Sequence, residues 1–414
     1  PHGRGFYYVH RSRLEGPRFR YHQLGLSAGS DSLLYGEFLP PTHFLAVSTA
    51  LKGRYRIYTI SHGWARNEVH VQDTQTGNLV DLTAGVDAHF TPQVVDDELW
   101  LRTDLAAPRG RVVAVDFRNP RREAWRIVLP ESEDVLDAFT LIDGKLYVTY
   151  LRNAAHRIAV FTRDGQPAGE VAVPPNATVS IRGAEPGSAL LTIASFTQPG
   201  VTYKLDLATG ARTVWERARV AFDTSAFEVA QHWYRSKDGT RAPLWVVQKR
   251  GHARSRNTPA LLHGYGGFAV NLGPRFDARA ALWVERGGIY VQATLRGGNE
   301  FGEAWHRGGM LTNKQNVFDD FTSAAQFLVD SGFTAPERLA IRGVSNGGLL
   351  MGAAITQRPD LFRAAFVGVP DLDLVRFPTF VTHNNAPALL EYGDARQPAE
   401  FEAIRTMSPY QNVK

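Results

Sequence analysis

Ser345 lies at the centre of the stretch of this chain that is best suited to covalent chemistry. The sequence around it reads as a short apolar strand, a tight turn from Gly343 to Gly347, and an apolar helix that opens near Gly348. A Gly-x-Ser-x-Gly turn between a strand and a helix is the pattern of a nucleophile elbow, in which small neighbours leave the serine oxygen exposed. Because a serine attacks a carbonyl only after a base removes its proton, the sequence predicts a nucleophile that requires a base.

A second stretch could stabilise the negative oxygen that such an attack creates. It reads His263-Gly-Tyr-Gly-Gly-Phe268 and lies after a predicted strand and before a predicted helix. Glycines there allow the backbone and one side chain to approach a substrate oxygen, and the N–H of Asn346, directly after the nucleophile, is the expected partner donor. Such donors contribute roughly 3 to 4 kcal/mol each. The alternative is a glycine-rich turn that only permits close packing of a strand against a helix.

The elements that would position these residues alternate between strands and helices. A hairpin around the Asp238-Gly239 turn opens this half, and a long polar connection follows residue 295 at the predicted carboxyl edge of the sheet. The predicted strands are 260–262, 289–295, 339–341 and 364–369, and the predicted helices are 278–286, 317–331 and 347–357. This alternation predicts an α/β-hydrolase fold with a mainly parallel sheet.

The first half of the chain repeats a β-rich pattern about every 44 residues. Runs ending near Asp73, Asp116 and Asp206, with a further copy at Ile158 to Phe161, are separated by one or two such periods. Several short strands per repeat are typical of β-propeller blades. The sequence predicts four blades and part of a fifth, with a β-sandwich as the alternative, and it places the domain boundary at residues 222 and 223.

The composition narrows the function classes. The chain has 414 residues, 21% charged residues, a net charge of +5 and no cysteine, so a globular protein without disulfides or thiol chemistry is expected. No apolar run reaches the roughly 18 to 20 residues of a membrane span. Its arginine clusters lie in turn-like stretches and are interpreted as solvated loops, so a nucleic-acid partner is not expected. A membrane partner is not expected either, and neither is a metal or another cofactor. Because the chain starts with Pro1, a processed product or a fragment is expected.

Taken together, these stretches resemble the prolyl oligopeptidase family of serine peptidases. The resemblance covers nearly the whole chain, and it is carried by the motifs at 263–268, 296–302, 313–321, 343–348 and 408–413. It implies a seven-bladed propeller that admits only short peptides, and a monomer of the cytoplasm or periplasm, with the cytoplasm preferred. By position it implies that Ser345 is the nucleophile, that the hydroxyl of Tyr265 and the N–H of Asn346 form the oxyanion hole, and that Phe268 is a wall of the substrate pocket.

The resemblance also implies residues that this chain does not contain. In the family, the aspartate and histidine of the triad lie beyond the segment matched by Ser408 to Val413, and the chain ends at Lys414. We therefore expect the chain to be part of a larger peptidase and to be incomplete at both ends. The alternative is an internal triad in which Asp371 or Asp373 and His383 serve Ser345.

Substrate preference is the second point at which the chain departs from the family. A tryptophan that stacks on the substrate proline is typical between the segments matched by Phe377 and Glu391, and the corresponding stretch here has none. Phe380, Tyr392 and Phe268 are the aromatic side chains available to replace it. Cleavage after proline is expected; an oligopeptidase or esterase without proline preference, or a propeller binding module with an inactive hydrolase domain, are the alternatives.

Overall fold

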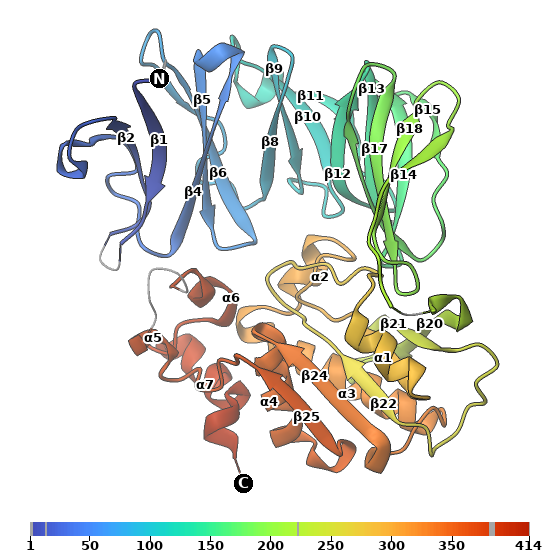
Figure 1. Ribbon diagram of the computed structural model, residues 1–414. Coiled ribbons are helices and arrows are strands. Elements are labelled where there is room, and N and C mark those ends of the chain that lie inside the picture. The colour runs from blue at the N-terminus through green and yellow to red at the C-terminus, as the bar shows by residue number, and fades with distance from the viewer. Residues whose placement is uncertain (1–2, 13–14, 222, 381–385, 414) are drawn as a thin grey trace. The chain divides into compact units, whose positions relative to one another are not determined.

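The first half of the protein is a series of antiparallel sheets. The computed structural model describes residues 3–12, 15–221, 223–380 and 386–413. Within these residues, each strand up to Arg217 pairs with its neighbour in sequence (Figure 1). The first sheet has three strands, β1 (Gly5–His10), β2 (Arg18–Gln23) and β3 (Ser32–Tyr35). The four-stranded sheets are β4 (His43–Ala50), β5 (Tyr55–His62), β6 (Arg66–Asp73) and β7 (Leu79–Asp81); β8 (Phe90–Val95), β9 (Glu98–Thr103), β10 (Arg111–Asp116) and β11 (Arg126–Leu129); β12 (Val135–Ile142), β13 (Lys145–Arg152), β14 (Ala155–Thr162) and β15 (Pro167–Val171); and β16 (Ala177–Gly183), β17 (Ser188–Ser195), β18 (Val201–Asp206) and β19 (Arg212–Arg217).

The sequence repeat falls on the same position of every four-stranded sheet. The repeated runs lie in β6, β10, β14 and β18, which are the third strands of their sheets. Turn residues such as Thr76-Gly77 and Thr209-Gly210 then lead into the fourth strand. The prediction of propeller blades is therefore confirmed, and the three-stranded sheet corresponds to the partial fifth blade.

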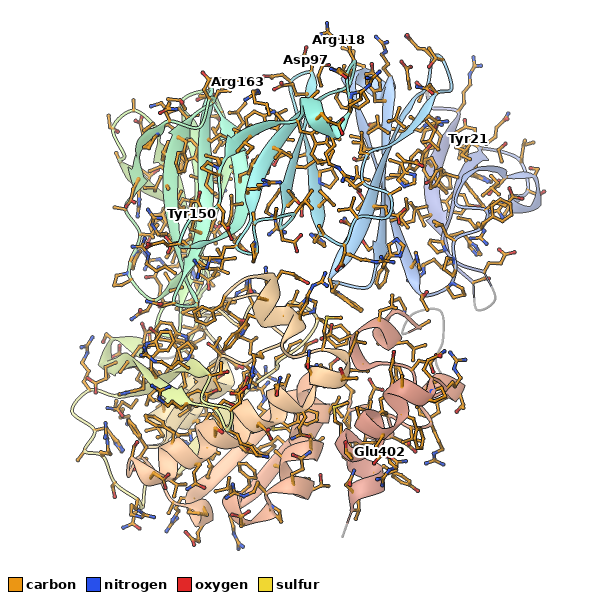
Figure 2. All side chains as sticks on the ribbon, turned by 180° about the vertical axis from the view of Figure 1, so that it is seen from behind. Tyr21, Asp97, Arg118, Tyr150, Arg163 and Glu402 are labelled. Carbon is orange, nitrogen blue, oxygen red and sulfur yellow. The ribbon has the colours of Figure 1, made fainter. Side chains whose placement is uncertain are left out.

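Apolar side chains fill the space between neighbouring blades. Tyr55 and Val71 of one blade pack in a single buried cluster with Leu99 and Val115 of the next. A corresponding cluster joins the blade β12–β15 to the blade β16–β19. Figure 2 labels one buried ring of these blades, Tyr150 on β13, which is 4% exposed. Each blade thus buries its faces against a neighbour, as the repeat requires.

The second half contains one six-stranded sheet. Its strands are β20 (Phe227–Arg235), β21 (Arg241–Lys249), β22 (Ala260–His263), β23 (Ile289–Ala293), β24 (Leu339–Val344) and β25 (Ala364–Gly368). The order is β20-β21-β23-β22-β24-β25; β20 and β21 form the predicted hairpin, β21 also runs antiparallel to β23, and the remaining pairs are parallel. Parallel neighbours place the carboxyl ends of β22 and β24 at one edge of the sheet, where ligands bind in open α/β folds.

Seven α-helices lie in the described part of the second half. They are α1 (Ala278–Glu285), α2 (Glu303–Arg307), α3 (Gln315–Asp330), α4 (Asn346–Gln357), α5 (Phe377–Phe380), α6 (Leu389–Tyr392) and α7 (Pro398–Met407). Three of them, α1, α3 and α4, pack on this sheet. Helix α1 begins after Asp277, whose carboxylate accepts the N–H of Arg279 as an N-cap, and packs on Trp245, Leu261 and Tyr290. All of the first nine residues of helix α4 are buried, because the helix lies against β24, β25 and α3.

The chain divides into two compact units. The first unit contains residues 1–130 and 375–404, and the second unit contains residues 131–374 and 405–414. The last two blades therefore belong to the same unit as the six-stranded sheet, although the sheets themselves change type between Arg217 and Phe227. Among the described residues, no helix combines the length and the apolar character needed to cross a membrane.

Candidate active site

Ser345 lies between the end of β24 and the start of α4 in a left-handed backbone conformation. Its φ and ψ are 60° and −122°, and its N–H donates to the carbonyl of Gly368 on β25 at 2.9 Å. A Cβ on Gly343 would lie 2.0 Å from the carbonyl oxygen of Gly347, so the two glycines of the motif allow the strand and the helix to meet. Ser345 itself is exposed. This is the geometry of a nucleophile elbow, with backbone strain held at the reactive residue.

Hydrogen-bond donors remain available at this turn. The N–H groups of Gly348 and Leu349 donate to the carbonyl of Ser345 at 2.7 and 3.1 Å. Within the described residues, the N–H of Asn346 has no acceptor, as is usual for the first turn of a helix, and the Oγ of Ser345 has no hydrogen-bond partner. The elbow thus offers a nucleophile and, one residue later, a backbone donor for an oxyanion.

The loop after β22 lies against the elbow. Strands β22 and β24 are parallel neighbours with His263 opposite Arg342, so their next residues leave the same edge of the sheet. A Cβ on Gly347 would lie 3.6 Å from the Tyr265 ring. The side-chain amide of Asn346 donates to the carbonyl of Tyr265 at 2.5 Å. The structure therefore brings Tyr265 next to Ser345 and Asn346, although it lies 80 residues before Ser345 in the sequence.

A buried lysine holds the next carbonyl of this loop. Lys314 is 0% exposed, and its ammonium donates to the carbonyl of Gly266 at 2.9 Å and lies 5.8 Å from the centroid of the Phe268 ring. A Cβ on Gly267 would lie 2.8 Å from that ammonium and 2.7 Å from the Asn346 amide nitrogen. The buried side chains of Lys314 and Asn346 thus donate hydrogen bonds to two successive carbonyl groups of the loop. The space between these two side chains at position 267 suits a glycine.

The two residues that follow these hydrogen-bonded glycines form a strained turn. Phe268 and Ala269 have φ values of 58° and 53°, and the N–H of Ala269 donates to the carbonyl of Gly297 at 2.9 Å. Left-handed backbone at two consecutive residues that are not glycine persists only where the surroundings fix it. Here the surroundings are the contacts of Lys314, Asn346 and Gly297.

The polar connection after β23 forms a buried ion-pair network. Arg296 donates to the carboxylate of Asp320 on α3 at 2.6 Å, to that of Asp238 at 2.5 Å and to the hydroxyl of Ser236 at 3.2 Å. Burial acts to raise the pKa of Asp238, but the bonds from Arg296 and Thr240 outweigh it and hold that pKa at about 2. The network ties this connection to α3 and to the β20–β21 hairpin, which gives the Arg296 and Asp320 motifs a structural role.

Glu300 lies in the same connection, and the pKa of its carboxyl group is shifted. The Oε1 of Glu300 accepts the N–H of Leu272 at 2.8 Å, while its Oε2 is buried without a partner in the described part of the chain. Burial raises the pKa of Glu300 to about 7. The carboxyl therefore joins the segment after the oxyanion loop to the connection after β23.

Comparisons with known proteins match both halves of the chain. Residues 1–218 match the model of the N-terminal β-propeller domain of prolyl oligopeptidases, and residues 274–414 match the model of the prolyl oligopeptidase family. The chain belongs to the prolyl oligopeptidase family. The resemblance deduced from the sequence motifs is thereby confirmed.

Individual members of the family give the extent of the likeness. Prolyl endopeptidase of Elizabethkingia meningoseptica is 32% identical over 399 residues, which are 95% of this chain and 56% of that protein. The dual function macrocyclase-peptidase POPB of Galerina marginata is 29% identical over 98% of this chain and 58% of its own length. A solved prolyl endopeptidase structure matches all of this chain at 37% identity with a TM-score of 0.95, and the chain covers 63% of it. This family member thus spans little more than half the length of those curated relatives.

Two predicted substrate contacts lie in the other compact unit. Phe380 and Tyr392 belong to the first unit, where both rings pack edge-on against Phe377 with centroids 6.0 and 5.8 Å from it. Phe380 is exposed, whereas Tyr392 is buried. Phe268 instead lies on the oxyanion loop. The roles of all three in binding substrate stay predictions.

The internal triad is not tested by the structure. His383 lies outside the described residues. Burial raises the pKa of Asp371, and Asp373 accepts a hydrogen bond from the amide of Gln411 at 2.8 Å. Within the described ranges, no group of three or more His, Asp or Glu side chains is arranged to hold a metal ion.

The sequence pointed to Ser345, Tyr265 and Asn346, which the structure brings together, but not to the residues that hold them in place. The stretch that contains Arg296, Glu300 and Lys314 was visible only as a polar connection at the sheet edge. Charged residues inside a glycine-rich connection are the signal that could have marked them, because a charge in such a place must be solvated or paired.

Proposed function

We propose that this chain supplies the propeller blades and the nucleophile of a serine peptidase that cleaves short peptides by acyl transfer. Ser345 attacks the scissile carbonyl, and the hydroxyl of Tyr265 and the N–H of Asn346 hold the negative oxygen of the tetrahedral intermediate. The acyl-enzyme on Ser345 is then hydrolysed by water. The observation that carries the proposal is the exposed, left-handed Ser345 with the Tyr265 loop held against its turn.

A general base completes this mechanism. The family resemblance implies a histidine oriented by an aspartate, neither of them within residues 1–414. The histidine would take the proton of Ser345 and return it to the leaving amine, while the aspartate would fix its tautomer. Without such a pair, the oxyanion donors and substrate binding retain roughly 10³- to 10⁴-fold of catalysis over water.

The test is covalent labelling of the natural full-length protein with a fluorophosphonate, followed by peptide mapping. A fluorophosphonate reacts with a serine only when a base and an oxyanion site activate it. We expect a single adduct on Ser345 and none in the Ser345→Ala variant. A folded protein in which Ser345 stays unmodified would contradict the proposal and favour the alternative of a binding module.

We propose a preference for proline before the cleaved bond, supported by the relatives named prolyl endopeptidase. The lack of the stacking tryptophan weakens this preference by about 1 kcal/mol, the scale of an aromatic contact, unless other rings replace it. A panel of chromogenic peptides that end in Pro, Ala or Arg measures it. Equal kcat/KM values across the panel would exclude a prolyl preference. The monomeric state and the cytoplasmic location remain predictions.

A further inference from the structure

The segment that leaves the oxyanion loop, residues 269–273, lies against two propeller blades of its own compact unit. The second unit contains this segment together with the blades β12–β15 and β16–β19. A Cβ on Gly273 would lie 2.5 Å from the hydroxyl of Thr178 on β16 and 4.0 Å from the carbonyl oxygen of Ala154, between β13 and β14. The blades therefore reach the chain only a few residues after Phe268.

One side chain of this segment, Asn271, makes hydrogen bonds in two directions. Its Oδ1 accepts the backbone N–H of Asn299 at 3.1 Å, and its Nδ2 donates to the Oδ1 of Asp137 on β12 at 3.2 Å. Because a backbone N–H can only donate, the oxygen of this amide must face Asn299, and the NH₂ group must face Asp137. Asn271 thus joins the loop to the connection after β23 on one side and to a blade on the other.

A β-bulge presents Asp137 to Asn271. The residues before and after it on β12, Leu136 and Ala138, pair with two consecutive residues of β13, so Asp137 is an extra residue in the ladder. A bulge redirects a side chain, and bulges are over-represented next to active sites. The strand therefore departs from regular pairing at the residue that contacts the loop.

A histidine of the same blade lies against the other oxygen of this carboxylate. The Nδ1 of His156 on β14 accepts the N–H of Val179 on β16 at 3.0 Å, so the proton of the neutral ring is on Nε2. That Nε2 lies 3.4 Å from the Oδ2 of Asp137. One oxygen of Asp137 thus faces Asn271, and the other faces a ring that the next blade holds in place.

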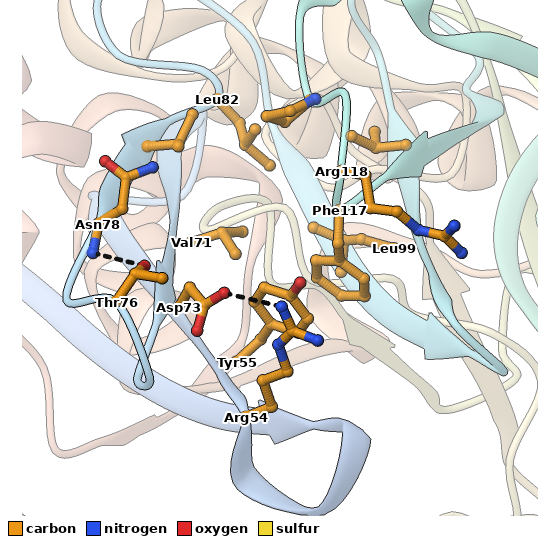
Figure 3. A pocket seen from close by; sticks show the side chains of 13 residues that line it. Arg54, Tyr55, Val71, Asp73, Thr76, Asn78, Leu82, Leu99, Phe117 and Arg118 are labelled. Carbon is orange, nitrogen blue, oxygen red and sulfur yellow. Dashed lines mark hydrogen bonds and ion pairs between the residues drawn. The ribbon is translucent and has the colours of Figure 1, made fainter.

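Contacts between neighbouring blades are of a different kind. In the first unit, Val71 and Leu99 meet in an apolar core, and the rings of Tyr55 and Phe117 stack with planes 6° apart (Figure 3). Apolar burial has no preferred direction, whereas a hydrogen bond weakens steeply when its angle departs from linearity. The bond between the loop and the blade is therefore suited to fix the position of the loop.

We propose that Asn271 is a positioning residue through which the blade β12–β15 sets the conformation of the oxyanion loop. The path is short, because the N–H of Val270, next to Asn271, donates to the carbonyl of Gly267 at 3.1 Å. Asn271 thus acts through the strained turn at Phe268 on the position of the Tyr265 hydroxyl. This inference rests on the proposed peptidase function, since it concerns a donor of the oxyanion hole.

The experiment exchanges the donor and the acceptor of this pair in the natural full-length protein. Asn271→Asp keeps the shape of the side chain and the acceptor for Asn299, but it turns a carboxylate towards Asp137. We expect kcat for a chromogenic peptide to fall roughly tenfold, the scale of one hydrogen bond, with KM nearly unchanged. Asp137→Asn alone should change kcat little, because its amide oxygen can still accept from Asn271.

The double variant separates positioning from a general loss of structure. With Asp137→Asn added to Asn271→Asp, the blade supplies the donor and the loop the acceptor, so kcat should recover to within about threefold of the unaltered value. The matched control is Asp73→Asn, which alters the exposed bond from Arg54 in a blade of the first unit (Figure 3) and should leave kcat unchanged. A normal kcat in Asn271→Asp, or a double variant that does not recover, would overturn the proposal.

Hydrogen exchange over residues 266–272 provides a readout that does not depend on catalysis. The N–H groups of Ala269, Val270 and Leu272 are hydrogen-bonded there. They should exchange about tenfold faster in Asn271→Asp and at the original rate in the double variant. If the unaltered protein cleaves no peptide, the proposed function fails, and exchange still decides whether the blade holds the loop. Equal exchange in the unaltered protein and in Asn271→Asp would refute the inference even in an active enzyme.

Discussion

The elbow and the oxyanion loop each contain a residue other than glycine with a positive φ, and the two are held by different means. Ser345 in the elbow has a φ of 60°, and Phe268 in the loop has a φ of 58°. The elbow is shaped by glycines within its own motif, since Gly343 and Gly347 let β24 and α4 meet. The loop is held by the side chain of Lys314, 48 residues away, and by that of Asn346, 81 residues from Tyr265. A strained site can thus be encoded locally or by buried polar groups from elsewhere in the fold.

Gly343→Ala should have the largest effect, because the elbow has no way to relieve a new clash. The added Cβ would lie 2.0 Å from the carbonyl oxygen of Gly347, which is backbone and is held between a strand and a helix. We expect a loss of about 3 kcal/mol or more in the free energy of unfolding, together with loss of peptidase activity. Thermal or denaturant unfolding measures the first, and hydrolysis of a chromogenic peptide the second.

The matched control for this variant is Gly200→Ala. A Cβ on Gly200 meets no atom within 4 Å, and its φ lies outside the left-handed region. It should unfold within about 0.5 kcal/mol of the unaltered protein, as surface substitutions usually do. Equal stability of the two variants would show that the elbow does not depend on close contact between its glycines.

Lys314→Met should damage the oxyanion loop and leave the elbow intact. A buried hydrogen bond from a charged donor contributes about 1.5 to 3 kcal/mol, so we expect kcat to fall roughly 10- to 100-fold. KM should change much less, because the loop acts on the negative oxygen of the transition state. Lys314→Arg should restore part of kcat, and Lys237→Met, at an exposed lysine, should have no effect. A Lys314→Met protein with normal kcat would contradict the role of this lysine.

Glu300→Gln should give a smaller effect that depends on pH. Burial raises the pKa of this carboxyl to about 7, so the folded protein favours the protonated form. Stability from this group is complete at low pH and is lost as pH rises from the usual pKa of a glutamate through 7. The unaltered protein should therefore lose about 2.5 kcal/mol more stability than Glu300→Gln between pH 5 and pH 8. Parallel stability profiles of the two proteins would contradict the burial of a titrating carboxyl.

The sequence predicted the features that are encoded locally, and not those that depend on side chains far away in the sequence. The blades, the alternating strands and helices and the Ser345 turn were predictable, because repeats, periodicity and glycine spacing are local signals. Strand β24 and helix α4 lie where the pattern around Ser345 indicates. The hydrogen bonds from Lys314 to Gly266 and from Asn346 to Tyr265 could not be predicted, because they depend on which distant polar groups the fold brings together. Local patterns also gave no means of assigning Phe380 and Tyr392 to the first unit rather than to the unit of Ser345.

A double-mutant cycle on kcat between Tyr265→Phe and Lys314→Met tests most directly whether the distant lysine positions the oxyanion loop. Tyr265→Phe alone should lower kcat by roughly 10²- to 10³-fold, the loss typical of one oxyanion donor. If Lys314 acts by positioning that donor, adding Lys314→Met to Tyr265→Phe should lower kcat by much less than it does in the unaltered protein. Two losses that simply multiply would contradict the account.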